Sequence, residues 1–279
     1  MDNFQSVVDQ LANLPSVPVV VQKLHMLIQD DGVGSREVAK IVETDSALVA
    51  RVLKLVNSSF YGMTQSVLSV EEAISIFGFN TLHQLVLSTA VFNTLDIDES
   101  TLDINSFWRH SFGVGVFAKH LRSSASKEIQ SEALTGGILH DIGRLVIAKS
   151  NPTKFEAFYF ERKAVTGIEQ EAEFFDHDHQ QIGEMLAKKW NFPDPIVAVI
   201  RSHHTPSDAP DEYKKLVAAV NIADLLCHMM QIGYSASSYA TEFDSEAWQC
   251  LDISMDELKG HIHSALNEID EASQILKNL

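Results

Sequence analysis

The sequence predicts an all-α protein, and three observations support that prediction. Apolar residues recur at intervals of three and four along most of the 279-residue chain, which is typical of helices with one buried face. Ser, Thr or Asp stands at the start of several of these segments, where an N-cap residue is expected. Alternation of apolar and polar residues, which would indicate strands, is almost absent.

The first part of the chain carries three helix signals. Residues 35–42 begin with Ser35 as the expected N-cap, and a second helix is expected to begin at Thr44 or Asp45. Ser69 and Glu72 form a capping box ahead of the apolar residues that follow. The next acidic and weakly periodic stretch, residues 93–105, predicts a boundary. We therefore expect an N-terminal helical subdomain of residues 1–98 and a second helical subdomain of residues 99–279.

The second subdomain begins with a helix that places a histidine on an apolar stripe. His110 shares a helical face with Val114 and Phe117, and Gly113 and Gly115 would let a neighbouring backbone approach closely. Residues 131–149 predict one continuous helix that contains His140 and Asp141 side by side. Adjacent residues of a helix diverge by about 100°, so these two side chains would flank a partner that lies between them.

Further polar residues fall on the apolar faces of later helices. His179 aligns with Ile182 and is predicted to point inward, whereas His177 is predicted to point outward. Asp194 is the expected N-cap of a helix with His203 on its apolar face and His204 at its end. Asp224 lies on another apolar stripe. In the last helix, apolar residues from 258 to 276 form a short heptad seam, which we expect to pack within the chain.

The composition limits the classes of partner. The formal net charge is −17, and no basic patch offsets it, so binding to nucleic acid or to anionic lipid is not expected. Cys227 and Cys250 are too few and too isolated for a disulfide framework, which fits a reducing compartment. The N-terminus is acidic and no apolar run is long enough to span a bilayer. We expect a cytoplasmic protein without a membrane segment.

The inward histidines and aspartates predict a metal site. An unpaired buried carboxylate costs several kcal/mol, and few Lys or Arg residues lie nearby in the sequence to compensate the charge. A metal ion is therefore the economical counter-charge for this set. The alternative for each residue is an ordinary hydrogen-bonded place in the core. That alternative is our interpretation of the remaining histidines: His25, His83, His120, His177, His228, His261 and His263.

Several motifs occur in an order that resembles the HDOD family of bacterial signalling proteins, within the HD superfamily of metal-dependent phosphohydrolases. They are "LPSVPVV", "LVNSSFYG", "SVEEAISIFGF", "FWRHS", "LHDIGRL" and "WNFPDPIVAVIRSHH", and they extend from about Leu14 to about Met229. The resemblance implies an N-terminal helical subdomain joined to an HD-like helical bundle. It also implies a regulatory or signal-transduction role, commonly without catalysis.

The resemblance further implies a ligand set for one or two divalent transition-metal ions. One ion would take His110, His140, Asp141 and Asp224, and a second would take His179, His203 and His204, with Asp141 bridging the two. Imidazole and carboxylate ligands suit Fe, Mn, Zn or Ni. If the centre is catalytic, Asp141 acts as the bridging ligand in hydrolysis of a phosphomonoester or phosphodiester.

Two departures from the related cyclic-dinucleotide phosphodiesterases argue against cleavage of cyclic di-GMP. Those enzymes carry a lysine after "HD-G" and a "GYP" segment after "HH", whereas this chain has Arg144 and "TPSDAP". Arg144 would either donate to a phosphate or stand on an exposed helix face without a specific role.

Three hypotheses for function follow. We prefer a regulatory module with a metal site, which binds a protein partner of a signalling pathway or a phosphate-containing small molecule. Its partner surface would include Asn57, Phe60 and Tyr61, unless Phe60 and Tyr61 form ordinary core between the subdomains. The second hypothesis is an active metal-dependent phosphohydrolase. The third, a helix-turn-helix-like nucleic-acid binder, offers only Arg51 and Lys54 to DNA and is the least favoured.

Overall fold

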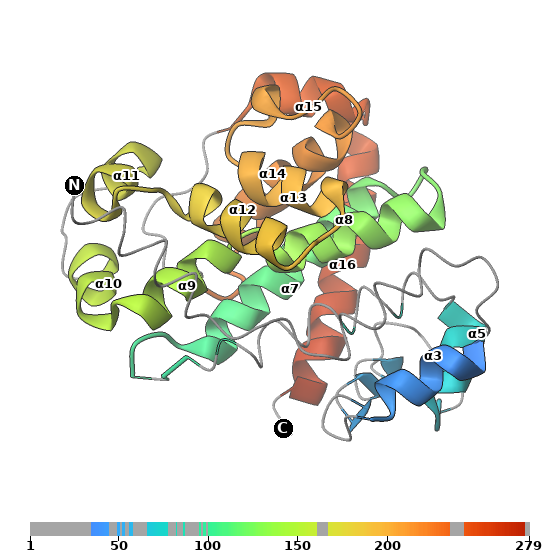
Figure 1. Ribbon diagram of the computed structural model, residues 1–279. Helices are drawn as coiled ribbons and strands as arrows, with labels where there is room; N and C mark the ends of the chain where they lie inside the picture. Colours follow the sequence, from blue (N-terminus) through green and yellow to red (C-terminus); the bar gives the residue numbers. More distant parts are fainter. Residues whose placement is uncertain are drawn as a thin grey trace. The chain divides into compact units, whose positions relative to one another are not determined.

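Every regular element that the computed structural model describes is a helix (Figure 1). The described residues are 35–44, 49, 50, 52, 53, 56, 57, 66–77, 82, 86, 95, 97, 98, 100–160, 167–234 and 243–276. The all-α prediction is thus confirmed. Close contacts divide the described residues into two units, one of residues 95–265 and one of residues 35–94 with 266–276. The boundary of the functional domains at residue 98 stays a prediction.

In the smaller unit, helix α3 (Ser35–Val42) packs against helix α5 (Val70–Phe77). The N-terminus of α5 is capped as the sequence predicts. The main-chain N–H of Glu72 donates to Ser69 Oγ at 3.1 Å, and the Glu72 carboxylate accepts from the N–H of Leu68 at 2.9 Å. The first bond satisfies an amide group that the first turn of the helix leaves without a helical partner, and the second ties Leu68, just before the cap, to the helix.

The predicted partner surface lies mainly outside the described residues. Phe60 and Tyr61 belong to the part that is not described, as do Arg51 and Lys54 of the helix-turn-helix hypothesis. Asn57 is described, and its amide donates to Val67 O at 2.7 Å and accepts from Val67 N at 2.6 Å. Its side chain therefore joins two backbone segments, and the partner surface stays a prediction.

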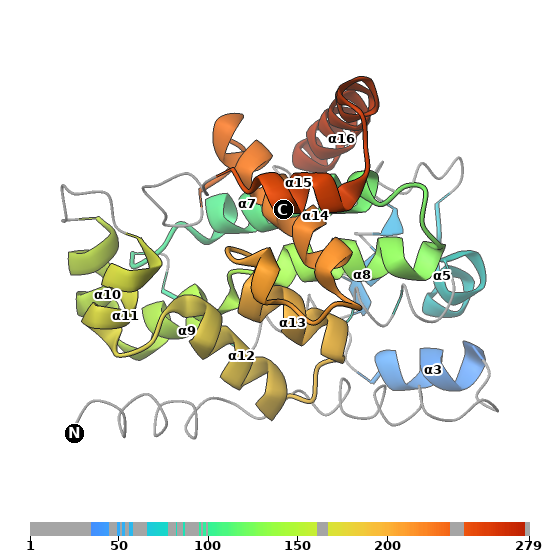
Figure 2. The same ribbon diagram turned by 90° about the horizontal axis from the view of Figure 1, so that it is seen from above.

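The larger unit is a bundle of helices (Figures 1 and 2). Several polar side chains are buried inside it. Its helices are α7 (Ile104–Leu121), α8 (Lys127–Leu139), α9 (Ile142–Ser150), α10 (Pro152–Tyr159), α11 (Ile168–Phe175), α12 (His179–Lys189), α13 (Asp194–Ser202), α14 (Lys214–Met229) and α15 (Ser245–Leu251), with a 3₁₀ turn at Pro206–Asp208. Helix α7 packs against α8 and α14, and α12 packs against α9 and α13. In both views α10 and α11 lie side by side at one end.

Two glycines let α7 and α8 approach each other closely. A Cβ atom on Gly137 would lie 2.5 Å from the Cα of Gly115, and a Cβ on Gly115 would lie 2.5 Å from the carbonyl oxygen of Leu134. Neither distance is compatible with a side chain, so the backbones themselves are in contact. The prediction of a close approach at Gly115 is confirmed.

The predicted continuous helix of residues 131–149 is wrong. Helix α8 begins earlier, after the N-cap Ser126, and ends at Leu139. Asp141, with φ −96° and ψ 15°, leaves the helical conformation, and α9 starts at Ile142. Because apolar residues continue at helical spacing on both sides of this break, periodicity alone does not reveal it.

The ends of two later helices test other sequence predictions. Helix α13 starts at Asp194 itself, one residue earlier than predicted, with Pro193 in the cap position. Helix α16 (Met255–Leu276) follows a capping box in which Ser254 N donates to Glu257 Oε2 at 2.8 Å, as predicted. Two members of its apolar seam, Ala265 and Ile269, are buried.

Among the described helices, none is both long and apolar enough to cross a membrane.

The close approach of α7 and α8 predicts a large effect of adding one methyl group. Gly137→Ala is expected to lower the free energy of unfolding by about 1–3 kcal/mol, because its Cβ meets backbone that has no room to move. Gly260→Ala in α16 is the control, since a Cβ there meets no atom within 4 Å. That change should raise stability by roughly 0.5–1 kcal/mol through helix propensity. Denaturant unfolding measures both, and a Gly137→Ala protein as stable as wild type would contradict the proposed packing.

Candidate metal centre

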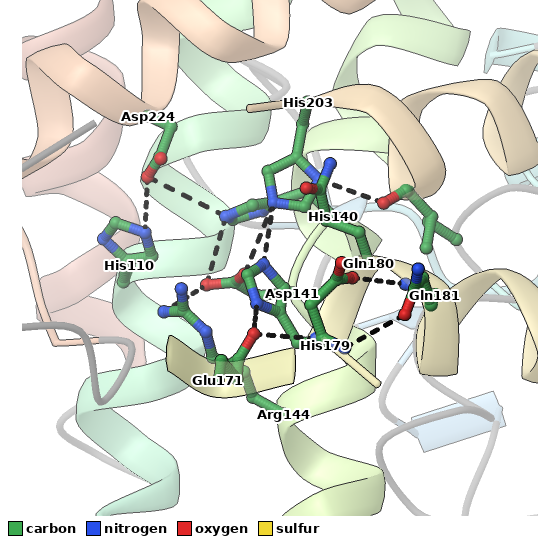
Figure 3. Close-up of polar contacts among 12 residues, drawn as sticks. His110, His140, Asp141, Arg144, Glu171, His179, Gln180, Gln181, His203 and Asp224 are labelled. Carbon is green, nitrogen blue, oxygen red and sulfur yellow. Dashed lines mark hydrogen bonds and ion pairs between the residues drawn. The ribbon is translucent and has the colours of Figure 1, made fainter. Parts of the chain in front are cut away.

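The predicted ligand residues come together inside the larger unit, at the break between α8 and α9 (Figure 3). His110 lies on α7, His140 and Asp141 occupy the break, His179 opens α12, His203 and His204 follow α13, and Asp224 lies on α14. All except His204 are at most 2 % exposed. The inward direction predicted for His179 agrees with the structure, whereas His177, predicted to point outward, is half-buried and has a buried Nε2 atom.

Asp141 stands at the centre of this group. Its Oδ1 lies 3.2 Å from His179 Nε2 and 3.6 Å from His203 Nε2, whereas its Oδ2 lies 3.3 Å from His140 Nε2. An aspartate before a helix usually accepts from the first amide groups of that helix, but the Asp141 side chain makes no such bond. The carboxylate is thereby directed into the site, with one oxygen toward each set of histidines.

Arg144 is buried, and the expectation of an exposed helix arginine is wrong. Its guanidinium is 2 % exposed, and Nη1 lies 3.0 Å from Asp141 Oδ2. Burial raises the pKa of Asp141, but the charges of Arg144 and His140 outweigh it and hold that pKa well below its usual range. Few cationic residues lie near these histidines and aspartates in the sequence, but the structure places one of them, Arg144, directly at the central carboxylate. To bind a phosphate, Arg144 would have to leave its ion pair with Asp141.

Main-chain carbonyl groups fix the orientation of two buried imidazoles. His140 Nδ1 lies 2.7 Å from the carbonyl oxygen of Gly137, and His203 Nδ1 lies 3.1 Å from that of Ile200. A carbonyl oxygen only accepts, so these contacts assign the ring proton to Nδ1 in each neutral histidine. In the neutral ring, Nε2 then carries a lone pair, which is the arrangement that orients histidines at metal sites. The charge of Asp141 raises the pKa of His140 and so favours a second proton on that ring.

His110 lies between Asp224 and a glycine-dependent turn. Its Nδ1 lies 3.3 Å from the carbonyl oxygen of Ile232, and its Nε2 lies 3.0 Å from Asp224 Oδ1. The following residue, Gly233, has φ +65°, and a Cβ there would lie 2.3 Å from the His110 amide nitrogen. Glycine thus lets the turn after α14 reach α7.

His179 is oriented by a carboxylate that the sequence did not single out. Glu171, on α11 and 3 % exposed, places Oε2 2.5 Å from His179 Nδ1 and 2.8 Å from the His179 amide nitrogen. Its other oxygen accepts from the hydroxyl of Tyr159 on α10. A carboxylate behind an imidazole makes the opposite nitrogen a stronger ligand. The interval between Glu171 and His179 contains the end of a helix, so no regular spacing connects them in the sequence.

The nitrogen and oxygen atoms that face the centre fit a bound cation. The Nε2 atoms of His179 and His203 lie only 3.2 Å apart. With the protons on the Nδ1 atoms, both are acceptors, and two facing lone pairs need a proton or a metal ion between them. His140 Nε2 and Asp141 Oδ1 are buried and find no hydrogen-bond partner among the described residues. Two groups of possible ligands each have all their ligand atoms within 4.8 Å of one another. One is Asp141 with His179, His203 and His204, and the other is Asp141 with His110 and His140.

His228 joins the group, which corrects its interpretation as an ordinary core histidine. Its Nε2 lies 3.3 Å from Asp224 Oδ1, and it forms a third possible ligand group with His110 and Asp224. Burial raises the pKa of Asp224, but hydrogen bonds from His110 and His228 lower it more, and the net shift is well downward. Asp224 and His228 are four residues apart on one helix, so this contact was available from spacing.

Comparison with known proteins assigns the family. The family model of the HDOD domain matches residues 14–206. The chain belongs to the HDOD family. An uncharacterized protein of Treponema pallidum (strain Nichols) is 28 % identical over 224 residues, which are 79 % of this chain. The chain spans 43 % of the length of that relative.

Solved structures of similar proteins share the fold. An HDOD domain protein of unknown function from Geobacter sulfurreducens is 23 % identical, with a TM-score of 0.74 over 98 % of this chain and 97 % of that one. A proposed phosphohydrolase from Shewanella amazonensis SB2B is 23 % identical, with a TM-score of 0.75 over 97 % of this chain and 98 % of that one. These likenesses confirm the all-helical architecture of this HDOD chain.

The buried histidines predict how the stability of the metal-free protein depends on pH. Burial lowers the pKa of His203 from 6.5 to about 4, and burial also lowers the pKa of His110 and of His204. Burial lowers the pKa of His140 as well, but the charge of Asp141 outweighs it, so the net shift there is upward. A histidine with a lowered pKa stabilises the fold above its unfolded pKa and loses that contribution as the pH falls.

Protein treated with chelator is therefore expected to lose stability as the pH falls from 6.5 toward 4. His203 alone contributes a loss of roughly 3 kcal/mol over this interval, and His140 offsets part of the total. Denaturant unfolding at a series of pH values measures the slope, and His203→Gln should make it shallower. A free energy of unfolding that stays level or rises over this interval would contradict the neutral, buried state of these rings.

Proposed function

We propose that this HDOD protein is a regulatory protein whose larger unit binds a divalent transition metal through its histidines and Asp141. The observation that carries the proposal is the pair of facing Nε2 atoms of His179 and His203, 3.2 Å apart beside the Asp141 carboxylate. A metal ion would satisfy both lone pairs and the negative charge together. Imidazole and carboxylate ligands suit Fe, Mn, Zn or Ni.

Burial of the centre supports regulation in preference to catalysis. His140, His179 and His203 are 0 % exposed, and the backbone and Glu171 hold their rings from behind. Structural metal sites are closed in this way, whereas catalytic sites keep a position open to substrate. Metal binding would then stabilise one conformation of the larger unit, and that conformation would be recognised by a protein partner or stabilised by a phosphate-containing small molecule.

A metal-dependent phosphohydrolase is the second candidate. It is favoured by the complete set of predicted ligands and by structural relatives described as proposed phosphohydrolases from Shewanella amazonensis SB2B. When bound, a transition metal polarises a phosphoryl oxygen and makes a water more acidic. In this chain Asp141 and the oriented histidines would hold the ion. His204 and His228 are only partly buried, so substrate would approach on their side.

The metal centre is tested by metal content and thermal stability. Protein purified without chelator is expected to carry a transition metal, and removal of the ion should lower the melting temperature because binding stabilises only the folded state. Asp141→Asn keeps the size of the side chain but removes its charge, and should abolish the bound metal. Asp211→Asn, at an exposed aspartate away from the site, is the matched control. Metal-free wild-type protein, or unchanged content in Asp141→Asn, would overturn the proposal.

Hydrolysis assays separate the two candidates. The regulatory proposal predicts no turnover of phosphomonoesters or cyclic nucleotides by the protein loaded with Mn²⁺ or Fe²⁺. The control is the Asp141→Asn protein under the same conditions, which reveals any contaminating phosphatase. Turnover by wild type that Asp141→Asn abolishes would establish the phosphohydrolase instead.

A further inference from the structure

The two oxygens of Asp141 face different electrostatic surroundings (Figure 3). Oδ2 lies 3.0 Å from the guanidinium of Arg144, which is as deeply buried as Asp141 itself. Oδ1 lies 3.2 Å from His179 Nε2 and has no hydrogen-bond partner among the described residues. A positive charge therefore already stands at one oxygen, while the other faces the lone pairs of imidazoles.

We propose that the guanidinium of Arg144 takes the place of a second metal ion at Asp141, so that this centre binds one ion. The ion binds on the Oδ1 side, with Asp141, His179, His203 and His204 as ligands. This inference rests on the proposed metal centre and replaces the two-ion arrangement, with Asp141 as a bridge, that the family resemblance implied.

Electrostatic repulsion opposes an ion on the Oδ2 side. A divalent ion bound to Oδ2 would share that oxygen with the guanidinium, and so the two cations would be close neighbours. Both would be buried, where little water is present to screen their repulsion. Arg144 belongs to the first turn of α9, and its main-chain N–H donates to the carbonyl oxygen of Asp141 at 2.9 Å. Unlike a free cation, the guanidinium is therefore covalently held near the site and cannot dissociate from the protein.

Two of the remaining ligands of the Oδ2 side, His110 and Asp224, are already bonded to each other. Asp224 Oδ1 lies 3.0 Å from His110 Nε2, which bonds to it, and 3.3 Å from His228 Nε2. His140 Nε2 lies between the carboxylates, 3.3 Å from Asp141 Oδ2 and 3.8 Å from Asp224 Oδ1. The negative charges of Asp141 and Asp224 are thus both compensated from within the chain on this side.

The Oδ1 side offers four ligands, at the oxygen of Asp141 that does not contact Arg144. The ligand atoms of Asp141, His179, His203 and His204 all lie within 4.8 Å of one another. Three imidazoles and a carboxylate are a common donor set for a four-coordinate transition metal. The facing Nε2 atoms of His179 and His203 belong to this side, where a cation is required.

Two matched substitutions locate the ion. Titration of metal-free wild-type protein with Mn²⁺ and with Zn²⁺ should saturate at one ion per chain at the centre. His203→Ala should weaken binding by more than about tenfold, because it removes a direct ligand, whereas His110→Ala should change the affinity by less than about threefold. Both residues are buried histidines, so each substitution removes a similar amount of packing, and a difference in metal affinity between the two variants reports the loss of a ligand. Equal losses in the two variants would overturn the assignment.

Substitution of Arg144 tests its role as the second cation. Arg144→Gln removes the charge and should raise the stoichiometry to two ions per chain, while Arg144→Lys keeps the charge and should leave it at one. The wild-type stoichiometry decides the question even if Arg144→Gln does not fold. Two ions in wild type, or one in a folded Arg144→Gln protein, would overturn this inference and leave the metal centre intact. No ion in wild type would overturn the metal centre itself.

Discussion

The negative charge of Asp141, buried in the middle of the larger unit, is the constraint on which the polar centre depends. A carboxylate in this position is stable only when cations and hydrogen-bond donors surround it. Arg144 supplies one cation at Oδ2, and the imidazoles of His140, His179 and His203 face the carboxylate with their Nε2 atoms. The Nε2 atoms of His179 and His203, 3.2 Å apart, in turn create a place for a further cation.

The backbone brings these groups together through close helix packing. A Cβ on Gly143 would lie 1.9 Å from the carbonyl oxygen of His179, so the first turn of α9 contacts the first turn of α12 directly. Asp141 lies two residues before Gly143, and this contact therefore sets the separation of Asp141 from His179. On the other side of the site, Gly233 brings the carbonyl of Ile232 to His110. Small residues thus position large polar ones.

Much of the fold and the identity of the central residues were predictable from sequence, because both depend on local pattern. Helical spacing placed His110, His179 and Asp224 on inward faces, and the motif "HDIGR" marked His140 and Asp141. The break after Leu139 was not predictable, since apolar residues continue through it. The burial of Arg144 and the contact of Glu171 with His179 depend on tertiary packing, to which spacing along the chain gives no access.

The most direct test of this account is the protonation state of the buried imidazoles, which ¹⁵N NMR of the metal-free protein at pH 7.5 can measure. We expect the rings of His179 and His203 to carry a proton on Nδ1, and addition of Zn²⁺ to shift mainly the Nε2 resonances. Protons on the Nε2 atoms of both rings, or resonances that do not respond to Zn²⁺, would contradict the convergence of lone pairs on a cation at Asp141.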